Sequence, residues 1–204
     1  MTEYWNESLT KASWESLQKF SKKYDFILID GWAVYLWTKQ HKSKDIDIVI
    51  DFETLGKLKQ YFDVTKNDRL KKYEIQRDKF DIDIYVIYYS ELGFPLEDMD
   101  VTEIEGFTVP ILEDLVILKQ NAEIDRRGSV KGKKDAVDIL SMLIYSDFDY
   151  ERYKSKLDEY GLDFEDELIH VVENFDVEES KYLKMGFKEF KDWQNVFLEK
   201  LGTR

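Results

Sequence analysis

The chain has 204 residues, of which 43% are hydrophobic and 36% charged, and its formal net charge is −13. This length suits one domain, or a small catalytic domain with a helical appendage, and the negative charge excludes nonspecific binding of nucleic acid over the whole surface. No cysteine occurs, which excludes disulfides, thiolate metal sites and cysteine nucleophiles. The N-terminal sequence lacks a signal-peptide pattern, and no apolar run approaches the roughly 20 residues of a membrane span. We therefore expect a cytoplasmic protein without membrane contact.

The first half of the chain alternates helical and strand patterns. Apolar spacing and strict alternation give its elements, in chain order. We expect a helix at 9–23, a strand at 26–29, a helix at 32–40, a strand at 45–50, a helix at 52–62, strands at 70–76 and 80–88, and a hairpin at 101–110.

From residue 111 onward, only helical periodicity remains. Helices are predicted at 112–126, 133–145, 149–160, 163–174 and 178–200. The sequence therefore predicts an α+β fold of mixed α/β type. A mixed β-sheet flanked by helices would form a core domain at 1–110, and a C-terminal helical bundle would form a second domain at 111–204.

Two predicted strands carry aspartates at alternate positions, although aspartate is disfavoured inside strands. Asp45 and Asp47 lie in one strand, and Asp81 and Asp83 lie in the other. Alternate residues point to the same face of a sheet, so neighbouring strands would bring several like charges together. Magnesium ions would compensate them, and two such ions can activate a hydroxyl and stabilise a leaving pyrophosphate. The alternative is a solvated sheet face without function.

The strand at 26–29 ends at Asp30-Gly31, directly before a predicted helix. A glycine at a helix start lets backbone N–H groups approach an anion closely, which suits a phosphate-binding turn. The alternative is that Gly31 only permits the turn while Asp30 caps the helix.

The run ILIDGWAVYLWTKQHKSKDIDIVID, at 27–51, resembles the signature of DNA polymerase beta-like nucleotidyltransferases. That signature is an apolar strand, a glycine turn, a helix and then Asp-x-Asp; here Asp45 lies 14 positions after Gly31 (45 − 31). The Gly-Trp-Ala turn and the segment from Ser43 to Asp47 are similar to the forms in minimal and AbiEii-like nucleotidyltransferases. The resemblance implies that Gly31 and Ser43 bind the nucleotide, and that Asp45 and Asp47 are catalytic and hold Mg²⁺ (or Mn²⁺).

The family's third carboxylate lies on a later strand and precedes several apolar residues. Asp83, followed by Ile84-Tyr85-Val86-Ile87, fits that pattern and would complete the catalytic and metal-binding set. Asp81, on the same face of the strand, is the alternative.

A segment of the helical half, 112–140, resembles the AbiEii-like helical segment, in which basic residues approach the nucleotide phosphates. Lys119 is the nucleotide-binding residue that this resemblance implies, and the window 119–134 is locally basic. The alternative is an ordinary solvated helix face. The further positions that the resemblance implicates are Arg127, Lys134, Asp135 and Asp138.

The chain departs from the family pattern at two positions. Asp30 stands where the family usually has its first glycine, and a carboxylate there repels a nucleotide unless it caps the helix or holds metal. His41 stands where the family often has an arginine.

The resemblance implies transfer of a nucleoside monophosphate from a nucleoside triphosphate to a hydroxyl of RNA, protein or a small molecule. The AbiEii likeness points to a toxin of a toxin–antitoxin system, with a cognate antitoxin as partner. One alternative is a catalytically degenerate nucleotidyltransferase-fold binding protein, acting as an antitoxin or a nucleotide sensor. Another is an α/β scaffold whose acidic face binds only cations.

Overall fold

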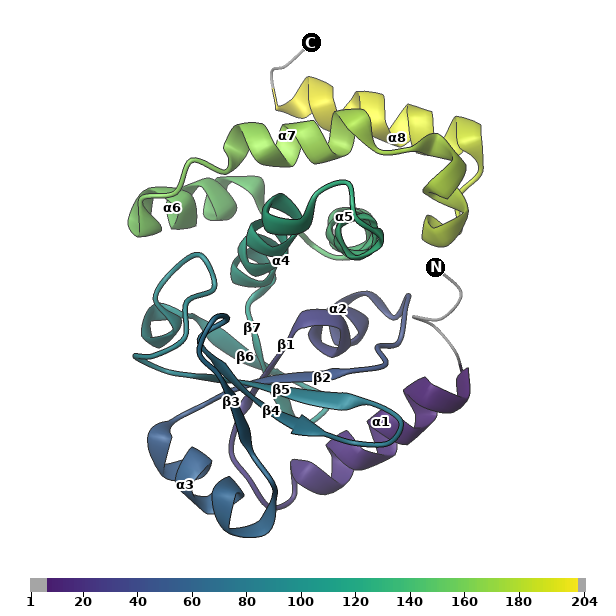
Figure 1. Ribbon diagram of the computed structural model, residues 1–204. Coiled ribbons are helices and arrows are strands. Elements are labelled where there is room, and N and C mark those ends of the chain that lie inside the picture. Colours follow the sequence, from purple (N-terminus) through teal and green to yellow (C-terminus); the bar gives the residue numbers. More distant parts are fainter. Residues whose placement is uncertain (1–6, 202–204) are drawn as a thin grey trace.

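The computed structural model describes residues 7–201, in which a five-stranded sheet lies between two sets of helices (Figure 1). The elements run in chain order α1 (Glu7–Phe20), β1 (Ile27–Ile29), α2 (Asp30–Thr38), β2 (Ile46–Ile50), α3 (Phe52–Tyr61), β3 (Thr65–Asn67), β4 (Lys72–Gln76), β5 (Asp81–Val86), a 3₁₀ turn (Leu96–Asp98), β6 (Val101–Ile104), β7 (Phe107–Pro110), α4 (Leu112–Arg126), α5 (Val130–Tyr145), α6 (Tyr150–Tyr160), α7 (Glu165–Asn174), a 3₁₀ helix (Val177–Leu183) and α8 (Phe187–Lys200).

The sheet has the strand order β1-β2-β5-β4-β3 and is mixed. Strands β2 and β5 pair in parallel, while β1 with β2, β5 with β4, and β4 with β3 pair in antiparallel fashion. Strands β6 and β7 form a separate hairpin. The predicted α+β class with a mixed sheet is therefore confirmed.

The two central strands divide their side chains cleanly between the faces of the sheet. Ile46 and Ile48 of β2, and Ile82 and Ile84 of β5, are 0 to 1% exposed and belong to the hydrophobic core. Because side chains alternate along a strand, the aspartates between these isoleucines point to the opposite face. Burial of the isoleucines thus fixes the register that presents the carboxylates.

Helices cover both sides of the sheet (Figure 1). Helices α1 and α3 lie on one side, and α2 lies on the other, where it packs against α4 and α5. The helices after residue 111 thus lie over α2 and cover the carboxylate face of the sheet.

Helix α3 begins at a cap, because the carboxylate of Asp51 accepts a hydrogen bond from the backbone N–H of Thr54 at 2.7 Å.

The helical half shares its core with the first half. One contiguous cluster of buried hydrophobic side chains includes Leu17 of α1, Ile48 of β2 and Leu198 of α8. The division into domains at 1–110 and 111–204 stays a prediction. Among the helices that the structure describes, none combines the length and apolar character needed to cross a membrane.

The predicted helix at 178–200 is wrong, because two elements occupy that stretch. The 3₁₀ helix ends at Leu183, the left-handed backbone of the next residue, Lys184 (φ 54°), turns the chain, and α8 starts after Gly186. A short strand at 65–67 and the 3₁₀ turn at 96–98 also escaped the sequence pattern, since both are too short to show a period.

Candidate active site

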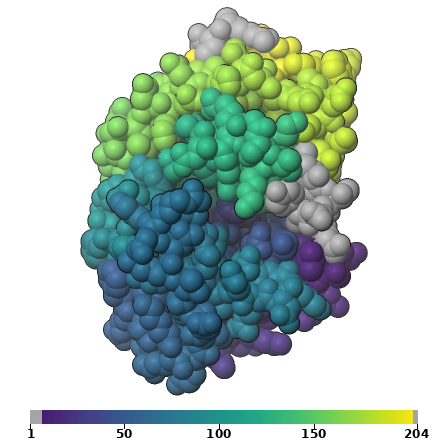
Figure 2. All heavy atoms as spheres, in the orientation of Figure 1, coloured from purple at the N-terminus to yellow at the C-terminus, as the bar shows by residue number. Residues whose placement is uncertain are grey.

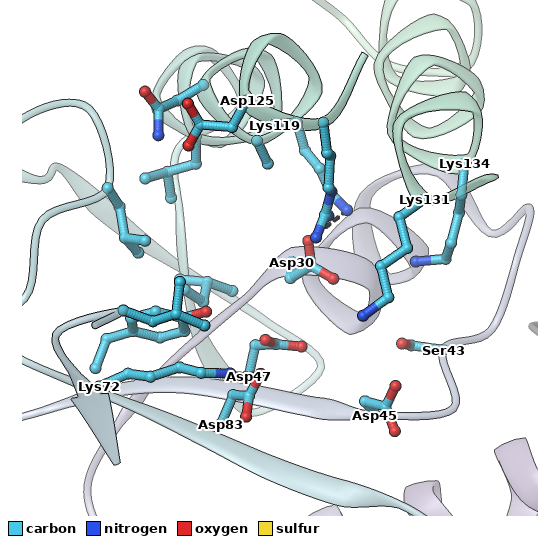
Figure 3. Close-up of a pocket in the computed structure, with 18 of the residues that line it drawn as sticks. Asp30, Ser43, Asp45, Asp47, Lys72, Asp83, Lys119, Asp125, Lys131 and Lys134 are labelled. Carbon is cyan, nitrogen blue, oxygen red and sulfur yellow. Dashed lines mark hydrogen bonds and ion pairs between the residues drawn. The ribbon is translucent and has the colours of Figure 1, made fainter. Parts of the chain in front are cut away.

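A cavity of about 370 Å³ lies between the carboxylate face of the sheet and helices α4 and α5. Figure 2 shows the surface hollowed at this place, and Figure 3 shows the side chains around it. Acidic groups come from β2 and β5, and basic groups come from the facing helices. The charged and hydroxyl-bearing residues of the lining are Asp30, Ser43, Lys44, Asp45, Asp47, Lys72, Asp83, Tyr85, Glu91, Lys119, Asp125, Arg126, Lys131 and Lys134.

The three carboxylates predicted from the sequence meet at this cavity. The parallel register of β2 and β5 places Asp47 directly opposite Asp83, and Asp45 lies one residue before β2. The two acidic strands are therefore neighbours, which is the condition under which their carboxylates converge. Asp81 lies at the exposed start of β5, outside the cavity lining, and its backbone N–H donates to the Asp45 carboxylate at 3.3 Å. Whether these carboxylates are catalytic stays a prediction.

Burial and like charge act on the carboxylates of the cavity. Burial raises the pKa of Asp47 well above its usual range, and the negative charges of Asp30 and Asp83 add to the effect. Burial also raises the pKa of Asp83, against the opposing hydrogen bond from Lys72. Both shifts disfavour the ionised carboxylates in this environment, and a bound cation would favour the ionised forms.

The donor chemistry of the site fits Mg²⁺ or Mn²⁺, which prefer carboxylate and phosphate oxygens and often take only one or two carboxylates from the protein. Asp45 and Asp47 are the residues that would hold such an ion. Within residues 7–201, however, no three acidic or histidine side chains are already grouped closely enough to enclose a metal by themselves. The remaining ligands would therefore come from the substrate or water.

Gly31 lies in the first turn of α2, pressed against Ser43. A Cβ at Gly31 would lie 2.7 Å from Ser43 Oγ and 3.3 Å from Lys134 Nζ, so glycine is required by close approach. Ser43 is itself buried at 3% exposure and lines the cavity. These two predicted nucleotide-binding residues are thus brought together at the helix start.

Asp30 is the first departure from the family pattern, and its contacts show how a carboxylate is accommodated at this position. The residue has a left-handed backbone (φ 54°), a conformation that favours glycine. Its carboxylate does not cap α2, whose cap residue is Ile29; it forms an ion pair with Lys119 instead. Burial opposes ionisation, but the ammonium groups of Lys119 and Lys134 hold the pKa of Asp30 far below its usual range. The capping alternative is therefore wrong.

Lys119 is 1% exposed and lies at the centre of a buried ionic network. Besides Asp30, its ammonium contacts Asp138 at 2.7 Å and Asp135 at 3.2 Å. Each of these two carboxylates also has a second cation. Three cations and three carboxylates form what we call the closed cluster: Lys119, Arg126, Lys134, Asp30, Asp135 and Asp138. The direct role predicted for Lys119 in nucleotide binding stays a prediction, and its contacts are those of a positioning residue.

The other basic positions divide into two groups. Lys134 lines the cavity, as do Lys131 and Arg126, which the resemblance did not single out. Arg127 instead pairs with Glu123 at 2.7 Å and Glu167 at 2.6 Å, outside the cavity lining, so its predicted approach to the phosphates finds no support. Arg126 is the last residue of α4 and Arg127 follows the helix end, so their side chains point in different directions and motif position alone did not separate them.

His41 lies outside the cavity lining, whereas Lys72 is part of it. His41 contacts the backbone carbonyl of Tyr182 and does not line the cavity. Lys72 of β4 does line it, and sequence reasoning missed this residue. The available signal was the alternation of Lys72 and Glu74 in a strand, but the pairing of that strand with β5 is not readable from the sequence.

Comparison with known proteins gives structural likeness only. No protein-family model and no curated protein matches the sequence. The fold is similar to that of JHP933 from Helicobacter pylori, with a TM-score of 0.51 and 18% identity over 97% of this chain and 96% of that one. An antigenic nucleotidyltransferase-like protein from Paracoccidioides brasiliensis is also similar, with a TM-score of 0.42 and 16% identity over 81% of this chain and 94% of that one. The likeness to JHP933 shows a shared fold over nearly the whole chain.

Proposed function

We propose that the chain is a nucleotidyltransferase that moves a nucleoside monophosphate from a nucleoside triphosphate to a hydroxyl group. The observation that carries the proposal is the arrangement of charge around one cavity. Asp45, Asp47 and Asp83 line the sheet side, while Lys131 and Lys134 line the helix side (Figure 3). The lysines on the helix side attract a triphosphate. Because phosphates and carboxylates repel each other, a cation must bridge the triphosphate and the aspartates.

The residues at the start of α2 would bind the phosphates. Backbone N–H groups at a helix N-terminus attract anions, and Gly31 leaves room for a close approach. Ser43 would donate its hydroxyl, and Lys131 and Lys134 would add positive charge. Lys119 would help to position Lys134, because Asp138 contacts both lysines.

Asp45 and Asp47 would hold Mg²⁺ or Mn²⁺, which when bound polarises the phosphoryl oxygens. Asp83 would accept the proton of the attacking hydroxyl, and its raised pKa makes it a stronger base than an ordinary aspartate. The hydroxyl oxygen forms a bond to the α-phosphorus, the bond from that phosphorus to the bridging oxygen breaks, and pyrophosphate leaves.

The acceptor hydroxyl would belong to RNA, protein or a small molecule, and the finer proposal is a toxin with a cognate antitoxin. The AbiEii-like sequence segments support that finer role. A specific observation favours the second candidate, a catalytically degenerate binding protein: the carboxylate of Asp30 lies on the cavity wall, where it competes with phosphate for the neighbouring cations. Turnover separates the two.

The first experiment combines thermal shift with transfer of labelled nucleotide. Magnesium plus a triphosphate is expected to raise the melting temperature of the wild type through ligand linkage. Asp45→Asn with Asp47→Asn is expected to abolish the shift and to reduce transfer by about 10³-fold or more, because the cation loses both protein ligands. A wild type that no triphosphate stabilises, in magnesium or manganese, would contradict the proposal. A shift without any transfer supports the binding protein.

The second experiment compares two aspartates of the same strand. Asp83→Asn is expected to lose transfer while keeping the fold, since Asp83 lies opposite Asp47. Asp81→Asn is the matched control and should retain transfer, because Asp81 is exposed and lies outside the cavity lining. Both variants are compared by single-turnover transfer and by urea unfolding, and the reverse order of activities would remove Asp83 from the proposed mechanism.

A further inference from the structure

Three carboxylates lie side by side across three strands of the sheet. Asp47 of β2 is opposite Asp83 of β5, and Asp83 is in turn opposite Glu74 of β4. We call Asp47, Asp83 and Glu74 the acidic row. Like charges directly opposite each other on a sheet face are destabilising, so such a row needs a source of positive charge.

Lys72 supplies part of that charge from within the sheet. Its Nζ lies 2.6 Å from Asp83 Oδ2 and 3.1 Å from Glu74 Oε1, and the residue is only 8% exposed. Glu74 has a second partner at the same oxygen, because Asn67 Nδ2 donates to Oε1 at 2.9 Å. Figure 3 shows the amino end of Lys72 pointing at Asp83 and Asp47. The ammonium is thus a fixed cation inside the row.

The position of Lys72 bears on how many metal ions the site takes. In a two-ion site the ions lie about 3.5–4 Å apart and share a carboxylate. An ion bound to Asp83 would lie within a few ångströms of the ammonium, where like charges repel strongly in a partly buried site. Within residues 7–201, neither Asp45 nor Asp47 forms an ion pair with a lysine or arginine.

We infer that Lys72 takes the place of one divalent cation. It holds Asp83 in position and leaves Asp45 and Asp47 to bind a single Mg²⁺ or Mn²⁺ together with the triphosphate. Lys72 is a positioning residue in this arrangement. The inference rests on the proposed function and departs from the two ions that the sequence alone suggested.

The test counts bound Mn²⁺ by electron paramagnetic resonance at saturating non-hydrolysable nucleoside triphosphate. The wild type is expected to bind one ion per chain. Lys72→Met frees Asp83 and is expected to bind two, whereas Lys72→Arg keeps the charge and is expected to bind one. Lys66→Met is the matched control, because Lys66 pairs with exposed Asp68 at 2.6 Å, and it is expected to bind one.

Two ions in the wild type would overturn the inference while leaving the proposed function intact. One ion in a folded Lys72→Met would overturn it as well, and folding is checked by the melting temperature. If Lys72→Met does not fold, the number of Mn²⁺ ions bound by the wild type and by Lys72→Arg decides the question. A second ion in either protein would overturn the inference. Absence of triphosphate-dependent Mn²⁺ binding in the wild type would remove the proposed function and the inference together.

Discussion

The molecule contains two groups of buried or half-buried charges that differ in balance. In the closed cluster, Lys119, Arg126 and Lys134 face an equal number of carboxylates, and the central lysine is almost completely buried. In the acidic row, Lys72 pairs with Asp83 and Glu74, whereas Asp47 has no ion pair within residues 7–201; Asp47 and Asp83 line the cavity. A group with equal numbers of cations and carboxylates can therefore be structural, whereas a group with excess carboxylates leaves negative charge that a cation can neutralise.

The largest effect is expected from a substitution that breaks the closed cluster. Lys119→Met would leave buried carboxylates without their shared cation, and removing one partner of a buried ion pair costs about 3–5 kcal/mol. Urea unfolding measures this loss. Lys133→Met is the control, because Lys133 pairs with Glu179 on the surface and should cost below about 1 kcal/mol. Equal losses in the two variants would show that the closed cluster is not structural.

A smaller effect is expected at the start of α2, where Gly31 lies close to Lys134 of the closed cluster. Gly31→Ala would force Ser43 to move, since the new Cβ would lie 2.7 Å from its Oγ. Overpacking of this kind costs about 1–3 kcal/mol, and triphosphate affinity should fall with it. Gly56→Ala in α3 meets nothing within 4 Å, so it should gain up to about 1 kcal/mol and leave binding unchanged. Denaturant unfolding and triphosphate titration test both variants, and unchanged affinity in Gly31→Ala would contradict the phosphate-binding role of this turn.

The smallest effect concerns the acidic row without metal. Because the folded state raises the pKa of Asp47, it holds that proton to higher pH than the unfolded chain, whose value is about 3.9. The stability of the wild type in chelator therefore falls as pH rises above about 4, and Asp47→Asn removes this loss. We expect the variant to be more stable at neutral pH by about 1 kcal/mol, the scale of one pKa unit.

Unfolding in chelator at several pH values measures the difference between Asp47→Asn and the wild type. Asp81→Asn, exposed at the start of β5, is the control and should change stability by less than about 0.5 kcal/mol. If Asp47→Asn loses stability in chelator, Asp47 stabilises the metal-free fold instead of destabilising it.

The acidic strands were readable from the sequence because strand alternation is local. Isoleucines alternate with Asp45, Asp47, Asp81 and Asp83, and this alternation predicted which face of the sheet is buried. The burial of Ile48 and Ile84 in the core agrees with that prediction. The choice of Asp83 over Asp81 as a cavity residue followed from the apolar run after it, and the structure places only Asp83 in the lining.

The pairing of cations with carboxylates was not readable from the sequence, because it depends on tertiary contacts. Lys72 meets Asp83 only through the antiparallel pairing of β4 with β5. Lys119 reaches Asp30 across 89 positions of the chain (119 − 30), after α4 has packed over α2. Asp30 adopts a left-handed backbone (φ 54°), a conformation that aspartate tolerates better than most non-glycine residues.

The strand order has a consequence for how copies of the chain behave at high concentration. The outermost strands, β1 and β3, are each three residues long, and β7 packs beside β1. Short edges with an exposed lysine, such as Lys66 in β3, offer few unpaired backbone groups as a template for another molecule's strand. The same sheet that concentrates acidic groups at its centre is thus poorly suited to edge-to-edge aggregation.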